Sequence, residues 1–245
     1  MSLKYSISAS GIKIERYTGT DSSPEIPSRI KNLPVTQIGN EAFANCVSLV
    51  SIRIPDSVKE IEDGAFRGCT SLTSIRLPKF VTEIEDTAFA ECTSLMMITI
   101  PESVRAIGEG VFTGCTSLKF IDSPLIPFFK DADFIHRKMD DRSVYVDGFV
   151  GKKSEIIVPA HVKNFAVVKI GRCAFVENKT LETIRIPDSV KMIGDGAFEA
   201  CSSLKSIGLQ NRSKCLLRMY VAQINRRSKR CHSDWQRNFF RVYVA

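Results

Sequence analysis

The hydrophobic positions of this chain recur at a fixed step of 23 residues. The stretch 52–72 reads Ile-x-Ile-Pro-x-x-Val-x-x-Ile-x-x-x-Ala-Phe-x-x-Cys-x-x-Leu, and close copies begin at Ile75, Ile98 and Ile184. Three columns of like residues advance by 23 positions: prolines at 55, 78, 101 and 124, phenylalanines at 43, 66, 89 and 112, and cysteines at 46, 69, 92 and 115. A period of this length is the signature of a solenoid, in which each repeat packs only on its neighbours.

Within each repeat, the polar and apolar order predicts one short strand followed by turns. The Ile-x-Ile alternation is typical of a strand with one face buried. The strand ends at proline, which has no N–H to donate to a ladder. Val58 and Ile61 then turn back inward, and the pair Ala65-Phe66 places a large ring between successive rungs. Gly64 lets the backbone turn tightly just before that ring.

Two long repeats and one loss of pattern divide the chain. Pro27 precedes Pro55 by 28 residues and Pro159 precedes Pro187 by the same 28, so a long repeat opens each of two arrays. The expected divisions are an N-terminal cap at 1–25, leucine-rich repeats at 26–124, an insertion or break at 125–147, repeats again at 148–209, and a basic tail or cap at 210–245. In the first of these, alternating residues predict a strand pair that covers the open end of the solenoid.

The basic character of the chain is confined to its last segment. Residues 210–245 contain nine Lys and Arg against one Asp, so the remaining residues hold 25 basic and 26 acidic groups. The repeat array is therefore close to neutral, and its charge does not indicate a nucleic-acid-binding body. Three interpretations of the tail stay open: a helical cap on the last rung, an aberrant carboxy terminus, or a basic tail that binds an acidic partner.

The cysteines follow the repeat rather than a disulfide framework. Five of the eight, Cys201 among them, occupy one column, each three residues after the phenylalanine. Such a column behaves as a small buried apolar set, so we favour reduced thiols over disulfides or a metal site. Asn178 fills the same column in the repeat after Phe175, and we expect it to point inward and to hydrogen-bond the backbone of the neighbouring rung.

The full repeat pattern, which runs from Leu49 to Leu72 and again from Leu181 to Leu204, resembles the BspA-like, or Treponema-type, leucine-rich repeat family. The resemblance covers roughly 26–124 and 156–209. It implies an α/β-type repeat solenoid, a right-handed leucine-rich-repeat horseshoe with short parallel strands and one interruption. Members of this family look like adhesins and ligand-binding modules on the surfaces of bacteria and some mucosal protists, not like enzymes.

The resemblance also implies a location and a partner. We expect a cell-surface or secreted monomer that binds a protein ligand, such as a host extracellular protein. No run of 18 apolar residues spans a membrane, and residues 1–5 lack the apolar core of a signal peptide. A cytosolic protein and a chain whose leader has been removed both fit this beginning.

The residues that point out of the Ile-x-Ile strands form the candidate binding surface. Because adjacent strands lie about 4.8 Å apart, the outward side chains of successive repeats are expected to make one continuous strip. Its candidate protein-binding residues are Arg53, Arg76, Met97, Thr99, Phe120, Asp122 and Arg185. Arg, Met and aromatic side chains are enriched at interfaces. The alternative is scattered surface, with Phe120 covered by residues 125–147.

Nothing in the sequence indicates a catalytic site, a cofactor or a metal. The acidic pairs at 62–63 and 85–86 recur with the repeat, so we expect solvated turn residues. The two glycines at 194 and 196 do not have the spacing of a nucleotide fingerprint. An enzyme would need the group Asp131, Asp133, His136, Asp140 and Asp141, whose spacing fits no template. The remaining rival function is a binder of nucleic acid or an anionic surface that acts through the tail.

Overall fold

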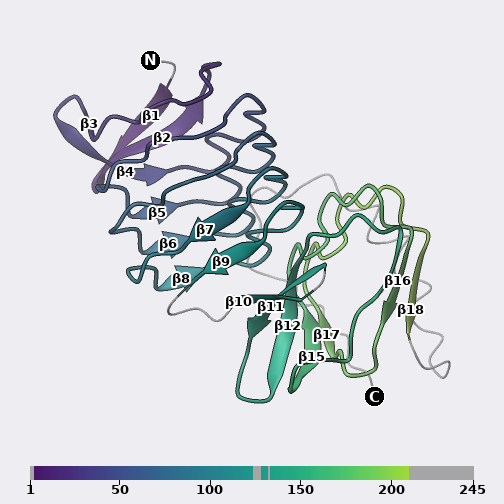
Figure 1. Ribbon diagram of the computed structural model, residues 1–245. Coiled ribbons are helices and arrows are strands. Elements are labelled where there is room, and N and C mark those ends of the chain that lie inside the picture. The colour runs from purple at the N-terminus through teal and green to yellow at the C-terminus, as the bar shows by residue number, and fades with distance from the viewer. Residues whose placement is uncertain (1–2, 124–127, 132, 210–245) are drawn as a thin grey trace.

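The computed structural model describes residues 3–123, 128–131 and 133–209 (Figure 1). The basic tail at 210–245 lies outside the described residues. The chain is a β-solenoid whose short parallel strands recur with the repeat of about 23 residues. The described residues contain no helix, so the helical part of the predicted α/β-type fold is wrong.

The turn that carries the Ala-Phe pair shows why no helix forms. Gly64 and Gly68 both have left-handed backbones, with φ of 60° and 72°. Residues in this conformation end helices rather than extend them. Alternate N–H groups of this turn also bond to the next rung: Phe66 donates to the carbonyl of Ala88 and Gly68 to that of Ala90, each at 2.8 Å.

An antiparallel hairpin covers the N-terminal end of the solenoid. Strands β1 (Leu3–Ser8) and β2 (Gly11–Tyr17) pair with each other, as the alternating residues predict. Strand β2 then pairs in parallel with β4 (Leu33–Ile38), which also pairs with the short β3 (Arg29–Ile30). The turn between β3 and β4 accommodates the additional length of the first repeat.

Two parallel ladders run along the first array. One stacks β4 on β5 (Glu60–Ile61), β6 (Glu83–Ile84) and β8 (Ala106–Ile107), and it was not predicted, because its short strands lie in the segment expected to turn back inward. The other ladder contains the predicted Ile-x-Ile strands. There, single bridges join Glu25 to Arg53 and Arg53 to Arg76, and β7 (Met97–Thr99) pairs with β9 (Phe120–Asp122).

Antiparallel strands separate the two arrays. Strands β10 (Phe128–Asp131), β11 (Phe134–Lys138) and β12 (Ser143–Phe149) pair in order, and β12 then pairs in parallel with β15 (Phe165–Ile170). Strands β14 (His161–Val162) and β17 (Met192–Ile193) complete that sheet. The second ladder of this half consists of β13 (Glu155–Ile157), β16 (Thr183–Ile186) and β18 (Ser206–Leu209).

Stacked aromatic rings fill the core of both arrays. The rings of Tyr17, Phe43, Phe66 and Phe89 lie 5.1–5.4 Å apart between centroids, and Phe112 follows at 6.1 Å. In the second array, the rings of Phe149, Phe175 and Phe198 stack at 5.3 and 5.0 Å. Stacked pairs at these separations add to the free energy gained by burial alone.

The cysteine column points inward, which confirms the predicted register. Each buried thiol donates a hydrogen bond to the carbonyl of the phenylalanine one rung earlier, as Cys69 does to Phe43 at 3.1 Å and Cys201 to Phe175 at 2.9 Å. The six cysteines among the described residues form no disulfide with one another. Burial raises the pKa of the Cys69 thiol to about 12, so the column is uncharged at neutral pH.

Asn178 departs from the prediction for this column. Its side-chain oxygen accepts hydrogen bonds from the backbone N–H groups of Thr180 and Leu181 in its own rung, at 3.0 and 2.8 Å. The expected bond to the neighbouring rung is therefore wrong. An asparagine oxygen can close a turn on the residues that follow it, and this local bond prevails here.

The junction between the arrays contains a shortened turn. Phe149 occupies the phenylalanine column, because its N–H donates to the carbonyl of Ala174 at 2.9 Å. Phe149 is three positions after Val146, whereas Phe175 is five positions after the equivalent Ile170, so the turn of β12 lacks two residues. In a full-length turn, the two missing residues would hydrogen-bond the backbone of the preceding rung. Charged side chains, described below, make those hydrogen bonds instead.

Candidate protein-binding surface

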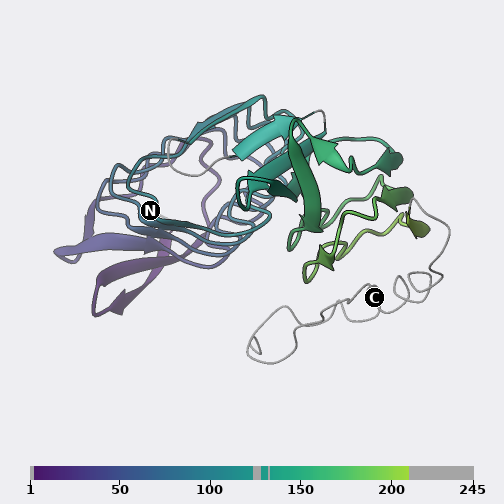
Figure 2. The ribbon, with the colours of Figure 1, turned by 90° about the horizontal axis from the view of Figure 1, so that it is seen from below.

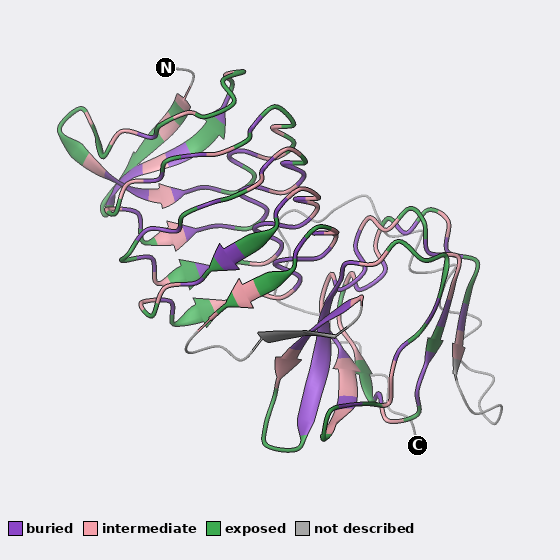
Figure 3. Cartoon of the chain, in the orientation of Figure 1, coloured by how far each residue is buried: buried purple, intermediate pink, exposed green. Residues whose placement is uncertain are grey.

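The outward residues of the Ile-x-Ile ladder form two columns in the first array. We call them together the first-array strip, which consists of Ser51, Arg53, Ser74, Arg76, Met97, Thr99, Phe120 and Asp122. The bridge between Arg53 and Arg76 and the pairing of β7 with β9 hold these columns in register. Figure 3 shows the exposed ends of β7 and β9 on either side of a more deeply buried isoleucine.

The C-terminal half of the strip is apolar. Met97 and Phe120 lie opposite each other in the register, and they are 53% and 58% exposed. The described residues of the segment 125–147 therefore leave Phe120 exposed. Large apolar side chains side by side on a surface are typical of interaction sites.

The sequence reasoning missed two exposed apolar residues beside the strip. Met96 and Val50 are also exposed, in the column one position before the strip. The signal was present in the 23-residue step, since Val50, Thr73 and Met96 are equivalent positions linked by backbone hydrogen bonds.

The N-terminal half of the strip is basic. Arg53 and Arg76 occupy adjacent rungs of the same column, and both side chains are exposed. Glu25 lies on the far side of Arg53, where their nearest charged atoms are 3.6 Å apart. Both groups are largely in water, so this pair contributes little to stability. Among the described residues, Arg76 forms no ion pair.

Arg185 does not belong to the same strip. It lies on β16, between Ile157 of β13 and Gly208 of β18, in a sheet that is separate from the ladder of β7 and β9. Figures 1 and 2 both show β16 and β18 well apart from β7 and β9. The prediction of one continuous strip is wrong, because the antiparallel strands β10 to β12 interrupt the stack.

The residues that an enzyme would need are dispersed. His136 is fully buried on β11, whereas Asp133 forms an ion pair with Lys153 at 2.9 Å. Asp140 accepts hydrogen bonds from the backbone of the turn between β11 and β12, and Asp141 is exposed beside Lys138. The structure does not describe the side chain of Asp131. In the parts of the chain that are described, no three His, Cys, Asp or Glu side chains are grouped as metal ligands.

The acidic turn residues are less solvated than predicted. Glu62 is buried, accepts a hydrogen bond from the N–H of Asn40 at 3.1 Å, and pairs with Lys13 at 2.6 Å. The carboxylate of Glu85 accepts from the N–H of Asp63 in the same way. These side chains satisfy backbone groups of the preceding rung, so they serve the fold.

The densest group of charges lies at the junction between the arrays. We call it the junction clasp, which consists of Asp86, Glu109, Arg137, Asp147, Lys169 and Arg172. Three ion pairs cross the junction or line it: Arg137–Asp147 at 3.0 Å, Lys169–Glu109 at 2.6 Å and Arg172–Asp86 at 2.6 Å. Clustered, perturbed charges of this kind often mark functional sites.

In the clasp, however, the charges replace backbone partners. Arg137 donates to the carbonyl of Ile107 at 2.8 Å and also to that of Gly108. In earlier rungs, the carbonyl equivalent to that of Ile107 accepts from a backbone N–H instead. For example, the N–H of Gly108 donates to the carbonyl of Ile84 at 2.7 Å. The carboxylate of Glu109 accepts from the N–H of Arg172 at 2.5 Å, beyond the shortened turn.

Two carboxyl groups of the clasp have pKa values shifted in opposite directions. Burial raises the pKa of Asp147 from 3.8 to about 6, although Arg137 opposes that shift. Burial acts in the same direction on Glu109, but the hydrogen bonds from Lys169 and the Arg172 backbone outweigh it and lower that pKa. Within the clasp, Asp147 therefore exchanges its proton near pH 6.

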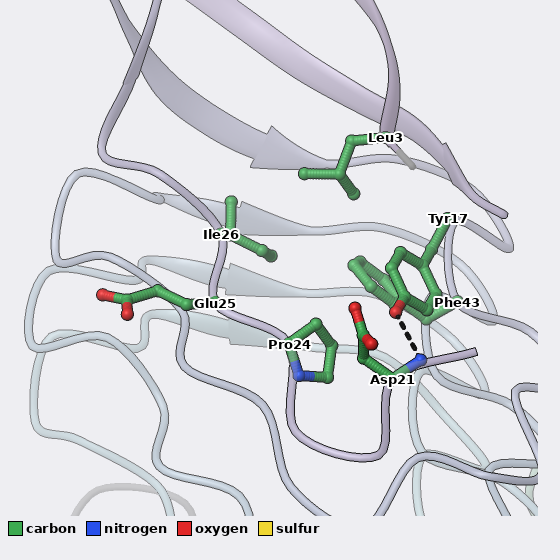
Figure 4. Close-up of a pocket in the computed structure, with 7 residues that line it drawn as sticks. All are labelled: Leu3, Tyr17, Asp21, Pro24, Glu25, Ile26 and Phe43. Carbon is green, nitrogen blue, oxygen red and sulfur yellow. Dashed lines mark hydrogen bonds between the residues drawn. The ribbon is translucent and has the colours of Figure 1, made fainter. Parts of the chain in front are cut away.

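A small cavity opens at the N-terminal end of the core. Its volume is about 60 Å³, and Figure 4 shows the seven residues that line it: Leu3, Tyr17, Asp21, Pro24, Glu25, Ile26 and Phe43. The hydroxyl of Tyr17 accepts a hydrogen bond from the backbone N–H of Asp21 at 3.1 Å. Ligand sites usually enclose about 300 Å³ or more, so this cavity is too small for a cofactor.

The part of the chain that the structure describes contains no helix long and apolar enough to cross a membrane.

Comparison with known proteins identifies the repeats. The BspA type leucine rich repeat region matches the chain in six copies, over residues 28–131 and 154–223. A leucine-rich repeat protein of T. pallidum is 30% identical, with 91% of this chain and 93% of that chain covered and a TM-score of 0.49.

Two further solved structures are more distant. A leucine rich cell surface protein of Faecalibacterium prausnitzii is 23% identical, with 84% of this chain and 74% of that chain covered and a TM-score of 0.36. The pneumococcal vaccine antigen PcpA is 18% identical, with 85% and 68% covered and a TM-score of 0.45. Among curated proteins, none matches the chain significantly.

Proposed function

The chain belongs to the BspA-type leucine-rich repeat family, and from this premise we propose that it is a non-enzymatic module that binds a protein ligand through the first-array strip. The observation that carries the proposal is the exposed pair Met97 and Phe120 beside the stacked Arg53 and Arg76. Met, Arg and aromatic side chains are the residues in which interfaces are enriched.

The rigidity of the solenoid supports this role. The backbone of β7 and β9 is held by ladder hydrogen bonds, and Ile98 of β7 packs into the hydrophobic core. A surface that is ordered before binding loses little conformational entropy when a partner arrives. The strip can thus bind without the ordering cost that a loop would bear.

The proposal includes a location and a class of partner. We place the protein at the cell surface or outside the cell, as an adhesin or antigen-like monomer whose ligand is an extracellular protein of a host. The support is the membership of the family, together with the names of two relatives, a cell surface protein and a vaccine antigen.

Paired variants of the full chain test the proposal. Binding to a panel of purified extracellular-matrix and serum proteins would be measured by biolayer interferometry for the wild type, Met97→Ala/Phe120→Ala, and the control Ile157→Ala/Met192→Ala. Loss of buried interface anchors typically costs more than 1 kcal/mol each, so we expect at least a ~10-fold weaker complex for the strip variant only. Equal affinity of both variants, with unchanged circular dichroism, would contradict the proposal.

The second candidate function rests on the nine basic residues of 210–245. A tail of this charge favours nucleic acid or an anionic surface. This alternative predicts an affinity that falls steeply with salt concentration and that disappears when residues 210–245 are deleted. The strip proposal predicts that the deletion leaves binding unchanged.

A further inference from the structure

The two halves of the first-array strip differ in chemistry along the stacking direction. The first two rungs present Arg53 and Arg76, and the last two present Met97 and Phe120. A partner that covers the whole strip must therefore meet guanidinium groups at one end and apolar side chains at the other.

Among the described residues, the charges of the basic end are only partly compensated. Like charges on adjacent strands repel each other. Glu25 compensates one side of Arg53 across 3.6 Å, and Asp122 stands two strands beyond Arg76 in the same column. Among the described residues, no carboxylate forms an ion pair with Arg76. A carboxylate supplied by a partner would pair with one guanidinium in the planar, bidentate geometry that arginine favours and would reduce its repulsion from the other.

The apolar end selects a different group. Met97 and Phe120 are opposite neighbours, and their side chains form one surface. A thioether makes favourable contacts with aromatic rings, and a phenylalanine ring stacks on or meets the edge of another ring. The matching group on a partner is an aromatic or large aliphatic side chain.

The spacing of the strands sets the distance between the arginine pair and the apolar pair. The centre of the arginine pair and the centre of the Met97–Phe120 pair are two rungs apart, which corresponds to about 10 Å. Resting on the proposed function of this strip, we propose that its partner is an acidic protein segment that presents a carboxylate and an aromatic or large aliphatic side chain about 10 Å apart along the solenoid axis. Because the two pairs also occupy columns two residues apart on each strand, about 7 Å across the strip, their direct separation is about 12 Å, which spans three to four positions of an extended segment.

A selection from random peptides displayed on phage, with the purified full chain as bait, tests this inference. We expect the enriched peptides to share an acidic residue followed or preceded by an aromatic or large aliphatic residue at that spacing. Their affinity for Arg53→Ala/Arg76→Ala and for Met97→Ala/Phe120→Ala should each fall about 10-fold or more. Arg185→Ala, an exposed arginine on the other sheet, is the matched control and should bind as the wild type does.

The remaining outcomes separate the inference from the function on which it rests. Peptides that depend on Met97 and Phe120 but carry no carboxylate, and that bind Arg53→Ala/Arg76→Ala normally, would overturn the partner chemistry and leave the binding surface in place. No enrichment, or peptides that bind the Met97→Ala/Phe120→Ala variant normally, would overturn both.

Discussion

The regular rungs of the first array and the junction before the second array solve the same structural problem with different groups. In the rungs, each ladder carbonyl accepts from a backbone N–H of the next repeat, as Ile84 does from Gly108. At the junction, the carbonyl of Ile107 accepts from the guanidinium of Arg137, whose charge is balanced by Asp147. The comparison teaches that backbone hydrogen bonds join the regular rungs, whereas charged side chains take their place at the interruption.

The largest effect is expected from breaking the aromatic stack. Phe66 is fully buried between the rings of Phe43 and Phe89. Phe66→Ala should lower the free energy of unfolding by about 3–5 kcal/mol, because it leaves a cavity that neighbouring rungs cannot fill. Urea denaturation followed by circular dichroism measures this change. Phe80→Ala is the control, since Phe80 is 63% exposed in the same array, and similar losses for both variants would contradict the account.

The next effect is expected at the junction clasp. Arg137 is 12% and Asp147 is 1% exposed, so Arg137→Ala leaves a buried carboxylate without its counter-ion. Removing one partner of a buried pair costs about 3–5 kcal/mol, and we expect the lower end because Arg137 lies near the surface. Calorimetry should show the second array unfolding before the first. A single, unshifted transition would show that the clasp does not hold the arrays together.

A smaller effect is expected in the pH dependence of stability, which should reveal Asp147 of the junction clasp. The folded pKa of Asp147 is about 6 and its ordinary value is 3.8, so the folded chain retains a proton that the unfolded chain loses between these pH values. The contribution of Asp147 to stability therefore falls as the pH rises through this window. Relative to Asp147→Asn, the wild type should lose about 1–3 kcal/mol of unfolding free energy, at about 1.4 kcal/mol per pKa unit.

Unfolding curves at several pH values across that window check this prediction. The carboxyl of Glu109 remains in both proteins, so its titration largely cancels in the difference. Parallel pH profiles for the wild type and Asp147→Asn would contradict the assignment.

The smallest effect on stability is expected in the strip itself. Met97→Ala/Phe120→Ala should change the unfolding free energy by less than about 1 kcal/mol, because exposed side chains bury little area in the fold. Thermal unfolding compared with the wild type measures this change. A loss as large as that of Phe66→Ala would show that these residues serve the core rather than a partner.

Much of the regular architecture could be predicted from the sequence, because the 23-residue period places each isoleucine, phenylalanine and cysteine directly over its equivalent. The inward cysteine column and the outward positions of Met97 and Phe120 follow from that period. The missing helix could not be predicted from the same pattern, since Thr87 and Glu91 adopt left-handed backbones without being glycine.

The break in the array carries no periodic signal, and this explains the errors about it. The role of Arg137 depends on a turn that is two residues short, and only the hydrogen bonds of Phe149 and Val146 reveal that register. The separation of Arg185 from the strip has the same origin. The repeat pattern predicts the strands within each array. How the two arrays meet depends on contacts between residues far apart in sequence, which a local pattern does not contain.

Hydrogen–deuterium exchange of the full chain with a selected peptide bound tests the central claim most directly. The account predicts added protection at β7 and β9, where the backbone carries Met97 and Phe120, and unchanged exchange at β16 and β18. Protection confined to β16 and β18, or to residues 210–245, would contradict the claim that the first-array strip is the binding surface.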